Sequence, residues 1–306
     1  MEYFILCLAV VCFAGQFAFT KSYEQAVKPS LVNTLVMLVL TSFFGALIYL
    51  VISGLKVNFS WFSFKLAIIF AFIMIPYYLL GIKALSLGSL AVYSVFMMLG
   101  GMLVPFFYGI IFLKENISFF KIIATILLTV FIILQSTAEV NKDTSTLKTE
   151  KNSKAKKSFF FILCLLIFFI NGLTGVITKA HEIGYNPIDE ISFTILYCSL
   201  TGFISLVILF GVMLLKRKTD KVNLKPTLKA KPVLITFLIG GTAYTGNYLH
   251  LVVASVVPAS VQFPIVSGGV IVLSSIVSRL IFKEKISKIE WASVVGALVS
   301  TILFAF

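Results

Sequence analysis

Long, unbroken apolar runs divide the chain and restrict what it can fold into. They lie near residues 3–20, 31–53, 62–83, 88–111, 119–137, 158–178, 191–215, 233–254, 257–281 and 290–306. A helix that crosses the apolar core of a bilayer needs roughly 20 such residues, and a membrane barrel would need alternating strands that these runs do not show. The sequence therefore predicts an all-α integral membrane protein with about ten transmembrane helices.

The composition excludes an ordinary soluble domain. Of the 306 residues, 59% are hydrophobic, 12% are charged and 31 are Phe, which is too apolar for a water-soluble surface. The formal net charge of +13 comes from Lys and Arg that gather in loops, so it favours membrane lipids as partners and argues against nucleic acid. Four cysteines stand in apolar runs without metal-ligand spacing, and we expect packing roles and no metal site for them: Cys7, Cys12, Cys164 and Cys198.

The chain contains an internal duplication. Residues 114–118 read Lys-Glu-Asn-Ile-Ser, and residues 283–287, which lie 169 positions further on, read Lys-Glu-Lys-Ile-Ser. The opening Phe-Ile-Leu-Cys-Leu of residues 4–8 recurs at 161–165. Because the first apolar run recurs inside the chain, we expect a retained helix there and no removable signal peptide.

Each copy holds about five apolar runs, and an odd number forces the second copy into the membrane upside down. We therefore expect two inverted five-helix repeats. The expected division is a first repeat at 1–137, a Lys-rich linker at 138–157 and a second repeat at 158–306. The linker and residues 216–231 carry most of the basic residues, which places them in the cytoplasm and both termini outside.

The repeated closings at 114–118 and 283–287, with Lys21 and Lys179 at the ends of the opening helices, resemble the drug/metabolite transporter superfamily, and within it the EamA family. The resemblance spans the whole chain. It implies a secondary carrier or exporter of small metabolites, with a central cavity between the halves and peripheral fifth and tenth helices. Members of that family usually have cytoplasmic termini, whereas the distribution of Lys and Arg predicts the opposite, so the orientation stays open.

Two helices in matching positions are interrupted by Gly and Pro, as happens at midplane binding sites of carriers built from inverted repeats. The alternative is close helix packing through small residues. The interrupting residues are Gly100, Gly101 and Pro105 in the fourth run and Pro258, Pro264, Gly268 and Gly269 around the ninth.

A few polar side chains lie far from the helix ends, where each must face protein or water because hydrocarbon is a costly surrounding. We expect them to line an aromatic, hydrogen-bonding pocket for a small-molecule substrate; the alternative for each is an interhelical hydrogen bond. These candidates are Gln16, Tyr77, Tyr78, Tyr93, Asn171, Thr174, Tyr244, Asn247 and Gln262.

Charged groups give a second set of expectations. His250 is the candidate for proton coupling, since an imidazole titrates near neutral pH, whereas Lys179 with Glu182 is expected to be a surface pair or headgroup anchor. His181 is expected in the loop after the sixth run. All twelve acids lie in loops or near helix ends, and Gln16 stands where, by the resemblance, cation-exchanging relatives carry a Glu. Because no acid is expected at mid-depth to bind a cation, we expect a neutral or zwitterionic substrate.

The function expected from the sequence is transport of a small organic metabolite, such as an amino-acid-like compound, a nucleoside or a sugar, by a multi-pass protein of the cell membrane that is a monomer or a homodimer. No HExxH or GxSxG motif or paired acidic motif is present, so we expect no catalytic residues and no cofactor. Two alternatives stay open: a membrane-embedded enzyme that acts on lipid-linked substrates, and a scaffold that transports nothing.

Overall fold

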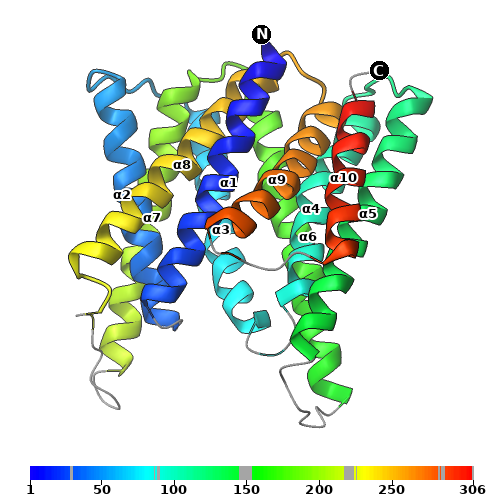
Figure 1. Ribbon diagram of the computed structural model, residues 1–306. Helices are drawn as coiled ribbons and strands as arrows, with labels where there is room; N and C mark the ends of the chain where they lie inside the picture. The colour runs from blue at the N-terminus through cyan, green and yellow to red at the C-terminus, as the bar shows by residue number, and fades with distance from the viewer. Residues whose placement is uncertain are drawn as a thin grey trace.

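The structure is a computed structural model, and it describes the chain except for residues 28–29, 86, 88–89, 145–153, 217–223, 225, 282, 284–286 and 305–306. Every regular element in the described part is a helix (Figure 1). The ten helices are α1 (Glu2–Ala26), α2 (Leu31–Ile52), α3 (Trp61–Leu85), α4 (Leu90–Ile111), α5 (Phe119–Thr144), α6 (Lys154–Glu182), α7 (Glu190–Lys216), α8 (Ala230–Ala254), α9 (Ala259–Ile281) and α10 (Lys288–Leu303).

Six of these helices have described stretches that are long and apolar enough to cross a membrane: Glu2–Ala26, Leu31–Ile52, Trp61–Gly81, Ser158–Glu182, Glu190–Leu215 and Ala259–Ile281. Two shorter apolar helical stretches are Val95–Ile111 and Phe119–Leu134. Because an all-helical fold leaves no backbone polar group unpaired in hydrocarbon, this is an all-α membrane protein, as the apolar runs predict.

The helix ends follow local chemistry more than the ends of the apolar runs. Ser30 caps α2 by accepting a hydrogen bond from the backbone of Asn33 at 3.2 Å, and Ser287 forms a capping box with Glu290 at the start of α10. Helices α5 and α6 extend to Thr144 and from Lys154, into the segment expected to be linker. Polar residues such as Lys and Glu are good helix formers, so the helices continue beyond the membrane core.

Successive helices run in opposite directions through the bundle, and both chain termini lie at the same end (Figure 1). We call this the terminal end. The opposite end, where α5 ends and α6 begins, is the linker end, and α7 ends and α8 begins there too (Figure 1).

Helices from the two halves alternate in the packing. Helix α1 packs against α8 and α9, while α6 packs against α3 and α4. Helix α2 packs against α7 and α8, α7 also packs against α3, and α4 packs against α9. At the edge, α5 and α10 pack against each other and against α4 and α9, respectively. The two halves therefore interlock, and neither could bury its apolar faces alone.

The tightest crossing is between α4 and α6, and it depends on glycine. A Cβ atom added to Gly100 would lie 2.1 Å from the backbone oxygen of Phe168, and one added to Gly172 would lie 2.7 Å from the backbone oxygen of Gly100. Such backbone-to-backbone approach is possible only without side chains. Gly100 thus serves close packing, which was one of the two sequence interpretations.

Candidate functional site

Tyrosines from three helices form a band that starts near the linker end. On α3, Tyr77 and Tyr78 pack edge to face, with ring centroids 5.2 Å apart. The Tyr77 and Tyr93 hydroxyls interact, which joins α3 to α4. Tyr78 also lies in the neighbourhood of Tyr244 on α8. The structure thus brings together four candidates from both halves.

Tyr244 continues the band to the side of the bundle formed by α2 and α7. Its hydroxyl lies 2.8 Å from the Ser42 hydroxyl of α2, and its ring lies 5.9 Å from that of Tyr197 on α7. Gly45 on α2 gives this ring its space, because a Cβ atom there would lie 2.1 Å from it. Tyr244 remains half-buried despite these neighbours.

Gln16 and Asn247 lie at mid-depth, near the contact between α1 and α8. Gln16 is two helical turns from Ala9 and from Tyr23, which are 0% and 4% exposed, so it lies on the inward face of α1. Asn247 donates to the Ala243 carbonyl of its own helix at 2.9 Å. Both amides are half-buried, and this exposure on an inward face fits the edge of an internal polar space.

Asn171 and Thr174 on α6 satisfy their hydrogen bonds within the protein. The Asn171 amide nitrogen donates to the Met97 carbonyl of α4 at 2.7 Å, and the Thr174 hydroxyl donates to the Asn171 carbonyl at 2.6 Å. These bonds fix the α4–α6 crossing beside Gly101, where an added Cβ atom would lie 2.6 Å from the Asn171 nitrogen. The interhelical alternative therefore describes Asn171 well.

Gln262 and His250 lie nearer the terminal end, and both are buried. The Gln262 side chain is 0% exposed and donates to the His250 carbonyl at 2.6 Å. The His250 ring meets Phe13 of α1 and Phe263 of α9 edge to face, at 6.0 and 4.9 Å. Its Nε2 and the Gln262 Oε1 are buried without a hydrogen-bond partner. Two unpaired polar atoms in one region are costly and leave hydrogen-bonding capacity for another molecule.

Lys179 corrects the expectation of a surface pair or headgroup anchor. Its side chain is 4% exposed, and its ammonium group donates to the carbonyls of Ala254 at 2.5 Å and Val257 at 2.7 Å. These carbonyls lie at and just after the C-terminal end of α8, where they have no partner within the helix. In the sequence, Lys179 is marked only by its position at the end of a repeated helix, and that position does not reveal that the side chain is buried.

His181 is likewise not in a loop, because α6 continues to Glu182. Its ring is fully buried and stacks on Phe193 at 3.7 Å. Its two ring nitrogens lie 3.0 Å from the Ser63 hydroxyl and 2.6 Å from the Glu182 carboxylate. His181 therefore joins the end of α6 to the start of α3, a role that the sequence did not indicate.

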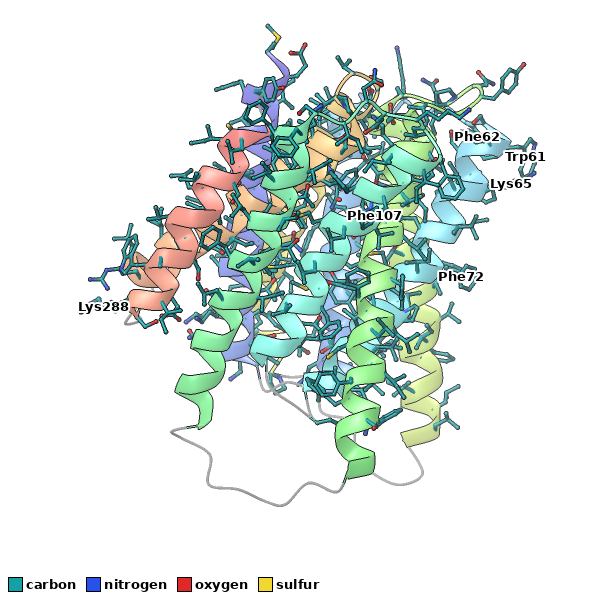
Figure 2. All side chains as sticks on the ribbon, turned by 90° about the vertical axis from the view of Figure 1, so that its right-hand side faces the viewer. Trp61, Phe62, Lys65, Phe72, Phe107 and Lys288 are labelled. Atoms are coloured by element: carbon teal, nitrogen blue, oxygen red, sulfur yellow. The ribbon has the colours of Figure 1, made fainter. Side chains whose placement is uncertain are left out.

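An aromatic pocket of about 410 Å³ lies beside His181, whose ring stacks on Phe62 with centroids 6.3 Å apart. It is lined by Phe59, Ser60, Trp61, Phe62, Tyr185 and Asn186, at the terminal end. Figure 2 shows Trp61, Lys65 and Phe72 projecting outward along α3, and Trp61 is 68% exposed. Exposed aromatic rings at a helix end are typical of the membrane–water interface, so we assign this pocket to the headgroup region.

Comparison with known proteins gives the fold alone. No protein-family model matches the chain, and no curated protein matches it. A protein of known crystal structure is similar over 99% of this chain and 97% of its own, with a TM-score of 0.71 and 14% sequence identity. The chain therefore shares its overall helical arrangement with a protein already solved, and that likeness carries no statement about activity.

Proposed function

We propose that the chain is a secondary transporter that carries a small, neutral or zwitterionic organic metabolite across the cell membrane by alternating access. It would do so as a multi-pass protein of two inverted five-helix repeats, of the kind found in the EamA family of drug/metabolite transporters. The observation that carries the proposal is the helix packing, because its main contacts recur when the two halves are exchanged.

Exchange replaces each of α1 to α5 by the helix five places later, and the reverse. The contacts of α1 with α8 and α9 then become those of α6 with α3 and α4, and each of these contacts exists. The contacts α2–α7, α4–α9 and α5–α10 map onto themselves. Lys114 and Lys283, 169 residues apart, share an unusual left-handed φ of 54°. A fold whose main helix contacts recur in this way can open alternately to either side.

The half-buried polar side chains support a substrate between the halves. Tyr78, Tyr93 and Tyr244 supply aromatic faces and hydroxyl groups, and Gln16 and Asn247 supply amides, all without charge. Such a surface suits an uncharged or zwitterionic molecule, which hydrogen bonds can orient. A carrier that exchanges a cation for protons usually holds the cation with a carboxylate at mid-depth. In this sequence the acids lie in loops or near helix ends.

Flux in proteoliposomes tests this proposal directly. We expect saturable uptake of at least one member of a panel of amino acids, nucleosides and sugars. Asn247→Leu should reduce that uptake about tenfold, because it removes a hydrogen-bonding group worth about 1.4 kcal/mol to the bound substrate, while expression stays unchanged. A folded protein that moves no member of the panel would favour a scaffold, and turnover of a lipid-linked substrate would favour an enzyme.

The sidedness of the loops is a separate part of the proposal. An even number of helices separates the linker from the 216–231 loop, so Ser153→Cys and Lys229→Cys, the latter at an exposed position, should react with an impermeant thiol reagent from the same face. The distribution of Lys and Arg predicts the cytoplasmic face. Reaction from the outside would place the termini in the cytoplasm, as is usual in the EamA family.

A further inference from the structure

A buried cation, Lys179, and a half-buried anion, Glu115, meet at the turn between α8 and α9, at the terminal end. From α6, the Lys179 ammonium group donates to the carbonyls of Ala254 and Val257. From the turn after α4, the Glu115 carboxylate accepts hydrogen bonds from the backbone nitrogens of Ala259 at 2.7 Å and Ser260 at 2.9 Å. One short segment of backbone is thus held by a cation at its beginning and by an anion at its end.

Each charge compensates one helix end. The C-terminal end of α8 carries partial negative charge on its unpaired carbonyls, and Lys179 neutralises it. The N-terminal end of α9 carries partial positive charge on its unpaired N–H groups, and Glu115 neutralises that. The Glu115 carboxylate also lies close enough to Lys179 to stabilise the ammonium group. A buried ammonium ion needs all of these partners, because its desolvation costs several kcal/mol.

If this end is to open, the pair of helices α4 and α6 must move away from the turn between α8 and α9. Lys179 lies on α6, and Glu115 follows α4, so together they join the α4–α6 pair to the α8–α9 turn. Close by, Phe263 of α9 also packs onto this pair, since a Cβ atom on Gly175 would lie 2.5 Å from its ring and 2.7 Å from Pro105. Opening would therefore break four charge-assisted hydrogen bonds at one place.

We propose that Lys179 and Glu115 form a latch that holds the terminal end closed while the linker end is open. They are positioning residues that set which end is open and do not touch the substrate. This inference rests on the proposed function, since a latch matters only in a protein that alternates between two states. It assigns transport roles to two residues that the sequence placed at helix ends without a function.

Thiol accessibility tests the latch without needing a substrate. In full-length protein whose four native cysteines are changed to alanine, Ser260→Cys places a thiol in the first turn of α9, where Ser260 is 0% exposed. A small, impermeant thiol reagent added at the terminal end should modify it slowly. With Lys179→Gln, we expect the rate to rise about tenfold, the change that about 1.4 kcal/mol of lost latch energy would give.

A second reporter separates a latch from mere loosening of the structure. Thr20→Cys lies on the inward face of α1, one turn from Gln16 toward the linker end, and is half-buried. If Lys179→Gln shifts the protein toward opening at the terminal end, reaction of this thiol from the linker end should slow as the other one accelerates. Acceleration at Ser260→Cys with no change at Thr20→Cys would overturn the proposal, because local loosening explains it.

Matched variants complete the test. Lys65→Gln removes the same charge from an exposed position of α3 near the same end, and should leave both rates unchanged. Glu115→Gln should act in the same direction as Lys179→Gln but less, and it carries the test if Lys179→Gln does not fold. The double variant should change the rates by less than the product of the single effects, since the two charges stabilise each other.

The outcomes separate the latch from the transport proposal. Equal Ser260→Cys rates in Lys179→Gln and Lys65→Gln would overturn the latch even if the proteoliposomes transport a substrate. Opposite shifts of the two reporters would support the latch even if the panel of substrates gives no flux, in which case the proposed substrate class fails alone.

Discussion

Helices α3 and α4 of the first half and α8 and α9 of the second bring one matching pair of positions into contact, with different chemistry. Tyr93 on α4 approaches Gly81 on α3, so that a Cβ atom there would lie 2.9 Å from the Tyr93 hydroxyl. At the positions 169 residues further on, Gln262 on α9 approaches His250 on α8 and donates to its carbonyl. The same pair of helix positions is in contact in both halves.

The difference shows which features of the two halves stay alike and which are free to change. The main contact partners of the helices recur in both halves, and because the halves pack against each other, a change in one half alone would disturb the packing of the other. Side chains at the contacts are free to change, and an aromatic hydroxyl faces a glycine on one side where an amide faces an imidazole on the other. A substrate bound between them would therefore meet a different surface on each side.

The largest effect should come from the crossings that tie these helices to α6 and α1. Gly100→Ala forces a Cβ atom onto the Phe168 backbone oxygen, whereas at the equivalent Gly269 the added atom meets the Val10 side chain at 2.8 Å. Backbone cannot move without shifting a whole helix, but a side chain can give way. We expect the free energy of unfolding to fall by about 3 kcal/mol in Gly100→Ala and by about 1 kcal/mol in Gly269→Ala.

Thermal unfolding of the purified variants in detergent measures this difference. Alanine is a better helix former than glycine at both positions, and this gain is the same in both variants and leaves the comparison intact. Equal melting temperatures for the two variants would mean that the α4–α6 and α9–α1 crossings are equally tolerant, contrary to the close backbone approach in the first.

A smaller effect should separate Gln262 from Tyr93 in transport. Gln262→Leu removes an amide whose Oε1 is buried without a partner, and we expect about a tenfold loss of uptake, equivalent to one hydrogen bond to the substrate. Tyr93→Phe keeps the ring and should cost about threefold. Initial rates in proteoliposomes provide the measurement, and a larger loss in Tyr93→Phe would place the important contacts on the α3–α4 side.

The smallest effect concerns two helix caps at matching places. Ser30 caps α2, and Asp189 caps α7 by accepting from the Ser192 backbone at 3.1 Å while also accepting from Asn58 at 3.0 Å. Partial burial raises the pKa of Asp189, but the hydrogen bonds from Ser192 and Asn58 outweigh it and hold this pKa below its ordinary value of 3.8. The carboxylate form is therefore the one that stabilises the fold.

Asp189→Ala should then cost about 1 kcal/mol at neutral pH. Because the folded pKa is lowered, the contribution is present above pH 3.8 and is lost as the pH falls through the lowered value. Ser30→Ala should cost a similar amount at every pH, since a hydroxyl does not titrate. Melting temperatures measured across acidic pH check both, and a pH-independent difference for Asp189→Ala would contradict the assignment.

The sequence predicted the helices well and the polar contacts poorly, for a physical reason. An apolar run of spanning length has few alternatives to a helix, so all ten runs correspond to helices in the described part of the chain. Whether Lys179 faces lipid headgroups or a helix end depends on how α6 meets α8, which no local pattern encodes. The closing motif could be compared only in part, because Glu284 lies outside the described residues.

The candidate pocket shows the same division. Helical periodicity puts Gln16 two turns from the buried residues Ala9 and Tyr23, and this much can be read from spacing alone. Spacing could not distinguish the roles of Asn171 and Gln262. The Asn171 amide donates to a backbone carbonyl of α4, whereas the Gln262 side-chain oxygen has no hydrogen-bond partner. That distinction depends on the neighbouring helix in each case.

The central claim is that the two halves cross the membrane in opposite senses, and Lys114 and Lys283 test it most directly. They occupy equivalent positions in the repeated Lys-Glu closings, share a φ of 54° and are both exposed. Single variants Lys114→Cys and Lys283→Cys, in sealed vesicles of one orientation, should react with an impermeant thiol reagent from opposite faces. Reaction of both from the same face would contradict the inverted repeat and the alternating access that depends on it.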